Sequence, residues 1–146
     1  MLYLVDDAAD YRFLVQQVFK LFLPQYPLRL FTDGIELIQH IEEKSAAYSV
    51  ASAEPDHDGP GPDIPDLIVL DVDMPKLNGL QTLERLKQNS QWRTVPVVVM
   101  SNRIDPEFKD TAYRLGANSY LTKPTDLSSM KEVMGRLCQE WIISSN

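Results

Sequence analysis

Acidic side chains directly follow two of the apolar runs in this sequence. Asp6 and Asp7 come directly after LYLV. Asp71 comes directly after LIVL, and Asp73 follows two residues later. Two carboxylates that lie close together repel, and each raises the pKa of the other unless a cation or water separates them. Each pair is therefore either a solvated turn or part of a site that holds positive charge.

A hydroxyl group and an amine follow two later apolar runs. Ser101 comes after VVVM, and Lys123 comes after NSYL and Thr122. In open parallel sheets, ligands bind beyond the carboxyl ends of the strands. If these runs are parallel strands, the serine, the lysine and the aspartates converge on one edge of the sheet.

This combination suits phosphoryl chemistry at a hard cation. Mg²⁺ prefers oxygen ligands, usually one or two carboxylates together with water and phosphate. A carboxylate can also attack phosphorus as a nucleophile and form an aspartyl phosphate. The metal, the Lys123 ammonium and the Ser101 hydroxyl would then stabilise the phosphoryl oxygens. Asp71 stands at a strand end, where a phosphodonor can reach it.

Apolar runs alternate with helical periodicity along the chain, which predicts an α/β fold. Asp33 with Glu36, and Asp105 with Pro106, are typical of helix starts. Apolar runs without polar alternation indicate strands buried on both faces, and hence a doubly wound parallel sheet with helices on each side. The five expected strands are LYLV, LRLF, LIVL, VPVVVM and NSYL.

One segment does not fit this alternation. Ser49–Asp66 contains four prolines, two glycines and four aspartates, a composition that cannot bury a core face. We expect the preceding helix to end near Tyr48 and this segment to form a mobile loop. Because it leads into the start of a strand, it should lie at the end of the sheet opposite the site.

Composition limits the possible functions. A chain of 146 residues corresponds to one ordinary domain, and no effector domain fits beside it. The net charge of −7, without a basic patch, argues against nucleic acid or an anionic membrane as a direct partner. The lone Cys138 and the absence of a signal peptide or a long apolar run favour the cytoplasm.

Four sequence pieces together resemble the receiver domain of response regulators, the CheY-like module of two-component signalling. They are VDD, VLDVDMPKLNG, VVVMSN and YLTKP, each at a predicted strand end and in the family's order. The resemblance covers essentially the whole chain as one receiver domain, residues 1–146. It implies a flavodoxin-like sheet with strand order 2-1-3-4-5.

The resemblance also implies a role for each acidic residue. Asp71 is expected to accept the phosphoryl group and to bind Mg²⁺. Asp7 is expected to bind the metal directly and Asp6 through water, while Asp73 contributes its backbone carbonyl. The side chain of Asp73 is expected to remain solvated.

The same resemblance assigns the later motifs. Ser101 is expected to contact the phosphoryl group, Lys123 to form a salt bridge with it, and Tyr120 to act as the aromatic switch. The Lys123–Pro124 peptide bond is expected to be cis.

The expected partners follow from the family. A sensor histidine kinase or a phosphotransfer protein would supply the phosphoryl group, or a small phosphodonor would do so. A downstream protein would bind the face formed by the last strand and the last two helices, and a homodimer is possible. No enzymatic activity is expected beyond self-catalysed phosphorylation and dephosphorylation.

Three features depart from the family pattern. Asn102 stands where a small residue is usual, and its side chain could narrow access to Asp71. Asp73 places an extra anion beside the site, where simple repulsion should slow small phosphodonors. The segment Ser49–Asp66 is longer than the usual connection.

Two alternative classes of protein share parts of this pattern. A haloacid-dehalogenase-type phosphatase also uses an Asp-x-Asp motif with a serine or threonine and a lysine, but its second acidic motif follows the lysine. In this sequence the Asp6-Asp7 pair precedes all other motifs. A pseudo-receiver that never carries phosphate is disfavoured by the complete set Asp7, Asp71, Ser101 and Lys123.

Overall fold

A five-stranded parallel sheet forms the centre of the molecule. The computed structural model describes residues 1–52, 64–73, 79–103 and 105–142. The strand order is β2-β1-β3-β4-β5, with every neighbouring pair parallel. The predicted fold and strand order are therefore confirmed. The strands are β1 (Leu2–Val5), β2 (Leu28–Phe31), β3 (Leu67–Asp71), β4 (Val97–Ser101) and β5 (Ser119–Thr122).

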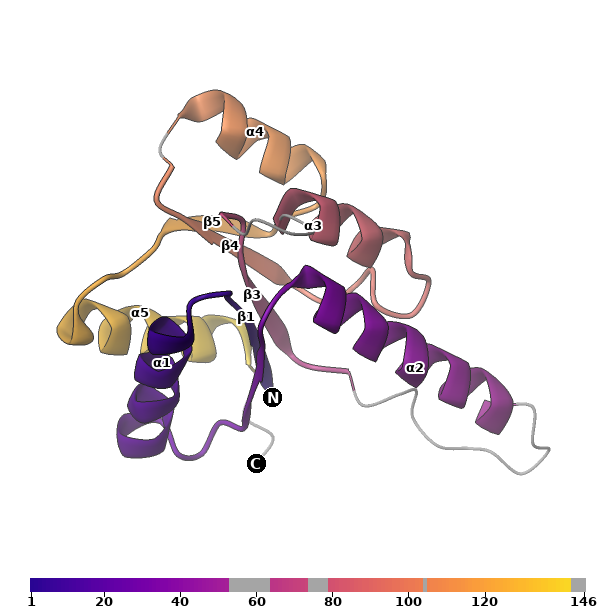
Figure 1. Cartoon of the computed structure of the whole chain (residues 1–146), viewed down its shortest axis with the longest axis horizontal. Coiled ribbons are helices and arrows are strands. Elements are labelled where there is room, and N and C mark those ends of the chain that lie inside the picture. Colours follow the sequence, from indigo (N-terminus) through magenta and orange to yellow (C-terminus); the bar gives the residue numbers. More distant parts are fainter. Residues whose placement is uncertain (53–63, 74–78, 104, 143–146) are drawn as a thin grey trace.

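Helices cover both faces of this sheet (Figure 1). One face carries α1 (Ala9–Phe22) and α5 (Leu127–Trp141), and the other carries α2 (Gly34–Ser52), α3 (Gly79–Gln88) and α4 (Pro106–Arg114). Side chains of each central strand alternate between two apolar cores, which explains why the strand sequences are apolar throughout. Within the described residues, none of the helices has the length and apolarity needed to span a membrane.

The pairing register brings the carboxyl ends of the central strands to one level. Val5 of β1 pairs with Leu70 of β3, so the residues that follow them, Asp6 and Asp71, are neighbours across the two strands. Ser101 ends β4 and pairs with the last residue of β5. The side chains that follow the strands therefore meet at one edge, as open α/β sheets require.

Side-chain caps fix the starts of two helices, as the sequence predicted. The Asp33 carboxylate accepts a hydrogen bond from the backbone N–H of Glu36 at 2.8 Å. At the start of α4, the Asp105 carboxylate accepts one from the N–H of Phe108 at 3.2 Å. Each cap satisfies a backbone donor that has no partner within its helix.

Helix α2 is longer than predicted. It ends at Ser52 instead of near Tyr48, so the expected start of the loop at Ser49 is wrong by one turn. The stretch Ser49–Ser52 contains neither proline nor glycine, and nothing in it terminates a helix. Residues 53–63 of the predicted loop lie outside the described residues.

The Lys123–Pro124 peptide bond is trans, so the expected cis bond is wrong. The trans isomer of a bond before proline is the more stable one by about 0.5–1 kcal/mol. With this trans backbone the Lys123 ammonium still reaches the acidic cluster, at 2.6 Å from Asp6 and 3.3 Å from Asp71.

Candidate functional site

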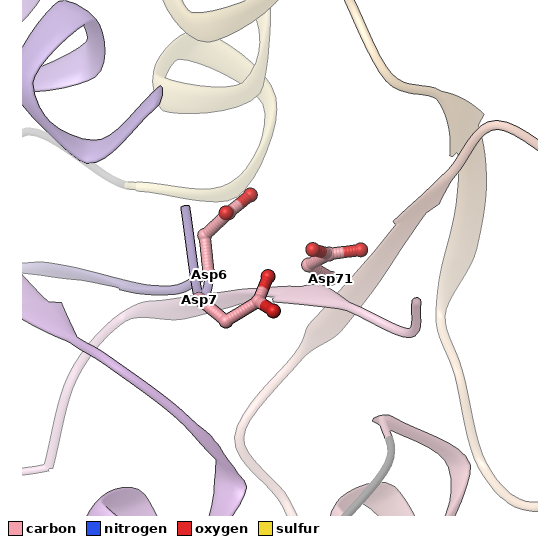
Figure 2. A group of neighbouring side chains, drawn as sticks. All are labelled: Asp6, Asp7 and Asp71. Carbon is pink, nitrogen blue, oxygen red and sulfur yellow. The ribbon is translucent and has the colours of Figure 1, made fainter. Parts of the chain in front are cut away.

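Three carboxylates lie together at the carboxyl edge of the sheet (Figure 2). Asp6 and Asp7 follow β1, Asp71 ends β3, and one carboxylate oxygen from each lies within 4.8 Å of the others. Asp6 and Asp71 are almost fully buried, whereas Asp7 is exposed. The sequence prediction that these three residues converge is confirmed by this geometry.

Lys123 lies between two of these carboxylates. Its ammonium is 2.6 Å from Oδ2 of Asp6 and 3.3 Å from Oδ2 of Asp71, and its side chain is largely buried. Burial alone would lower the pKa of Lys123, but the hydrogen bond and charge of Asp6, together with those of Asp71, raise it above the ordinary value. The two carboxylates therefore favour the protonated form of the lysine.

Asp71 has a perturbed acidity. Burial raises the pKa of Asp71 to about 6; the N–H of Asp73 and the Lys123 ammonium oppose this rise, and the charge of Asp6 adds to it. A divalent cation beside the carboxylate would favour its ionised form. Buried carboxyls with specific charged neighbours are frequent at functional sites.

The donor set fits a hard divalent metal ion. Three carboxylates can each offer an oxygen at close range, and oxygen is the ligand that Mg²⁺ and Mn²⁺ prefer. One lysine balances only part of their combined charge. A cation beside the exposed Asp7 would therefore relieve the repulsion among these carboxylates that Lys123 leaves uncompensated.

Ser101 is fully buried at the end of β4, and its hydroxyl bonds to Asp73. The Oγ–H is shared between the two carboxylate oxygens of Asp73, each at 3.1 Å, while Oγ accepts from the N–H of Arg103 at 2.9 Å. Asp73 also accepts from the N–H of Asn102 at 3.2 Å. The Asp73 side chain is exposed, as expected of a solvated carboxylate, but it also accepts from two protein donors, the Ser101 hydroxyl and the Asn102 N–H.

Asp73 is bonded to Asp71 as well. Its backbone N–H donates to Oδ1 of Asp71 at 3.0 Å, which ties the loop after β3 to the carboxylate. This contact holds one oxygen of Asp71, while Lys123 contacts the other.

Tyr120 lies apart from the carboxylates but is linked to Ser101 through one residue. Its hydroxyl donates to the carbonyl of Arg103 at 2.9 Å, and the N–H of Arg103 donates to Ser101. The Tyr120 ring packs edge-on against Phe108, over which the Arg103 guanidinium lies at 3.9 Å from the ring centroid. Tyr120 thus packs against the α4 side of the sheet.

Sequence reasoning missed two residues of α1 that support the site. The Lys123 ammonium lies 4.2 Å from the centroid of the Tyr11 ring, and the Tyr11 hydroxyl donates to the carbonyl of Pro124. The Arg12 guanidinium donates to the carbonyl of Asp6 at 2.7 Å. The only available signal was their position in the first turn of the helix that follows Asp6-Asp7.

A fold and an acidic edge of this kind define a CheY-like receiver module. The model of the response regulator receiver domain family matches residues 2–134, and the chain belongs to this family. That result excludes the dehalogenase-type alternative.

Curated relatives support the same assignment. The chain is 27% identical to response regulator Rcp1 of Synechocystis over 137 residues, covering 94% of this chain and 84% of Rcp1. It is 30% identical over 86 residues to the probable methanogenesis regulatory protein FilR2 of Methanothrix harundinacea, covering 59% of this chain. That match spans only 56% of FilR2's own length.

Solved structures of similar proteins share the fold. The phosphorylated cyanobacterial phytochrome response regulator RcpA superposes with a TM-score of 0.71 at 25% identity, covering 99% of this chain and 95% of RcpA. The Mn²⁺-bound form of Rcp1 gives a TM-score of 0.68 at 27% identity, covering 99% and 96% of the two chains. The class of the protein is thus established as a response regulator receiver domain.

Proposed function

We propose that Asp71 of this receiver domain accepts a phosphoryl group in a reaction that requires Mg²⁺. The observation that carries this proposal is the position of Asp71: it is buried at the strand end, with Lys123 on one oxygen and two further aspartates within 4.8 Å. The phosphorylated form of the similar protein RcpA supports the same chemistry. The pseudo-receiver alternative predicts no labelling at all.

Asp7 and Asp71 would hold the metal directly, Asp6 would do so through water, and the backbone carbonyl of Asp73 would be a further ligand. Bound there, the metal would neutralise charge on the carboxylates and on the phosphoryl oxygens. The Mn²⁺-bound form of Rcp1 supports a divalent ion in this place, and the chemistry of the ligands favours Mg²⁺.

The chain's own groups account for the transfer. A carboxylate oxygen of Asp71 attacks phosphorus, a new P–O bond forms, and the bond from phosphorus to the donor breaks with its electron pair leaving on the donor. When the donor is a phosphohistidine, the released imidazole takes its proton from water. The Lys123 ammonium and the Ser101 hydroxyl would donate to the transferred phosphoryl oxygens.

The phosphorylated chain is the product of this transfer, and the chain acts as a signalling protein. We propose a sensor histidine kinase or a phosphotransfer protein as the donor. A downstream protein, or a second copy of this chain, would bind the face formed by α4, β5 and α5, where Tyr120 would respond to phosphorylation. No turnover is proposed beyond self-catalysed phosphorylation and dephosphorylation.

Two further points belong to this proposal. Residues 1–146 are proposed to form one receiver domain, with the proline-rich segment inserted between α2 and β3. The cytoplasm is the proposed compartment, a choice supported by the buried free thiol of Cys138.

The test is intact-mass spectrometry after incubation with acetyl phosphate, with Mg²⁺ or with EDTA. We expect the addition of one phosphoryl group in Mg²⁺ only. Hydrolysis of p-nitrophenyl phosphate over many turnovers would contradict a signalling role without enzymatic activity.

A further inference from the structure

The single proton of the Ser101 hydroxyl is already donated in a hydrogen bond. A serine hydroxyl is one donor, and here that donor points to the Asp73 carboxylate at 3.1 Å from both oxygens. The oxygen of the same hydroxyl accepts from the N–H of Arg103. Because Ser101 is fully buried, solvent offers it no easy replacement for Asp73.

A phosphoryl group on Asp71 would need the same proton. Ser101 ends the strand next to Asp71, and it is the hydroxyl assigned to the phosphoryl oxygens in the proposed function. One O–H cannot donate fully to the Asp73 carboxylate and to a phosphoryl oxygen at once. The two anions therefore compete for Ser101.

A phosphoryl group on Asp71 would displace the Asp73 carboxylate from the Ser101 hydroxyl. This carboxylate is bonded to Ser101, which ends the strand next to Asp71, so a phosphoryl group on Asp71 that reaches Ser101 would repel it. The charge of a phosphoryl group is about −1.5 to −2 near neutral pH. The side chain of Asp73 is also exposed, and water can solvate it once it is displaced. The Asp73 carboxylate could therefore be either bonded to Ser101 or solvated by water.

We propose that Asp73 is a positioning residue that holds the Ser101 hydroxyl in the unphosphorylated protein and competes with the phosphoryl group for it. This inference rests on the proposed phosphorylation of Asp71. Release of Ser101 also loosens its bond with the Arg103 N–H, and the carbonyl of Arg103 accepts from Tyr120. The Asp73–Ser101 contact therefore opposes the change from the unphosphorylated to the phosphorylated arrangement.

This mechanism differs from simple repulsion of donors by the Asp73 charge. Repulsion depends on charge alone, so Asp73→Asn and Asp73→Ala should act equally, and added salt should weaken both effects. Competition depends on an acceptor for Ser101. Asp73→Asn keeps one carbonyl oxygen as an acceptor, whereas Asp73→Ala removes every acceptor.

The test uses beryllium fluoride, an analogue of the phosphoryl group on a carboxylate, in excess Mg²⁺. Its dissociation constant is measured by calorimetry for wild type, Asp73→Asn and Asp73→Ala, each with Ser101 intact and with Ser101→Ala. We expect Asp73→Ala to bind about fivefold to tenfold more tightly than wild type, as suits the loss of one competing hydrogen bond. Asp73→Asn should gain about twofold, and with Ser101→Ala the gain from Asp73→Ala should nearly vanish.

A second readout needs neither metal nor phosphoryl analogue. In metal-free protein, the amide hydrogens of Asn102 and Arg103 should exchange severalfold faster in Asp73→Ala, because their acceptors are removed or released. Unchanged exchange rates at both amides would show that Asp73 does not hold Ser101 in the unphosphorylated protein, and would overturn the proposal.

The outcomes separate the two proposals. If no variant binds beryllium fluoride, the proposed function fails and the competition fails with it. If wild type and Asp73→Ala bind it equally, only the role of Asp73 is overturned. Equal gains in Asp73→Asn and Asp73→Ala that persist with Ser101→Ala would assign the effect to charge repulsion and overturn the competition.

Discussion

The Lys123 ammonium lies 2.6 Å from Oδ2 of Asp6, a carboxylate with 1% of its surface exposed. This ion pair makes the lysine the counterion of the most buried acid in the site, in addition to its contact with Asp71 at 3.3 Å. Breaking a buried pair leaves one uncompensated charge, which is costly even where the pair itself contributes little net stability.

Lys123→Gln is therefore expected to destabilise the metal-free protein by about 1–3 kcal/mol. Because Mg²⁺ would compensate the same carboxylates, it should restore part of that loss, so the metal should stabilise the variant more than wild type. Urea denaturation with Mg²⁺ and with EDTA measures both effects. The exposed Lys109 on α4 provides the control, Lys109→Gln, and a loss that Mg²⁺ leaves unchanged would contradict the account.

Asp71→Asn is expected to make the metal-free protein more stable near pH 7.5, by about 1–3 kcal/mol. The pKa of Asp71 is raised to about 6, so between its ordinary value and 6 the folded state binds more protons than the unfolded state. In the wild type, the contribution of Asp71 to the free energy of unfolding therefore falls as pH rises through this window. Denaturation should show a clearly larger advantage of the variant at pH 7.5, above this window, than at pH 4.5, which lies inside it. An equal advantage at both would refute this reading.

Asp7→Asn is expected to weaken Mg²⁺ binding by roughly tenfold or more, because Mg²⁺ depends on few carboxylates. Since Asp7 is exposed, metal-free stability should change by less than about 0.5 kcal/mol. Thermal denaturation over a Mg²⁺ titration reports both quantities. Asp10→Asn, which removes a nearby exposed carboxylate outside the cluster, should keep wild-type affinity, and equal losses in the two variants would point to general charge effects.

Tyr120→Phe is expected to lower stability by about 0.5–1 kcal/mol through loss of the hydrogen bond to the Arg103 carbonyl. The ring keeps its packing against Phe108, and the hydroxyl donates its proton to the Arg103 carbonyl and not to a carboxylate of the site. Labelling by acetyl phosphate should therefore proceed at close to the wild-type rate. A severalfold change in that rate would show that Tyr120 acts on the chemistry and not only on the fold.

The sequence was sufficient to predict the sheet and most of the acidic edge. Apolar runs without alternation fixed the strands, and the residues directly after them, Asp6, Asp7 and Lys123, had to meet once the strands were parallel. The strand order came from the family resemblance and agrees with the structure.

Side-chain pairing at the site was beyond sequence reasoning. The choice of Ser101 as the partner of Asp73 depends on rotamers across two strands, and the placement of Tyr11 against Lys123 depends on how α1 packs. The end of α2 was missed because Ser49–Ser52 carries no stop signal, while the prolines that marked the loop come later. Local sequence patterns do not encode long-range contacts such as those between Ser101 and Asp73 or between Tyr11 and Lys123.

The central claim is that Asp71 is the residue that carries the phosphoryl group. Wild type and Asp71→Asn, both treated with acetyl phosphate and Mg²⁺, should be compared by intact mass, with tandem mass spectrometry of the labelled peptide. We predict one phosphoryl group on wild type, located at Asp71, and none on Asp71→Asn. Equal labelling of the two proteins, or a phosphoryl group located at Asp7 or Asp73, would contradict the account.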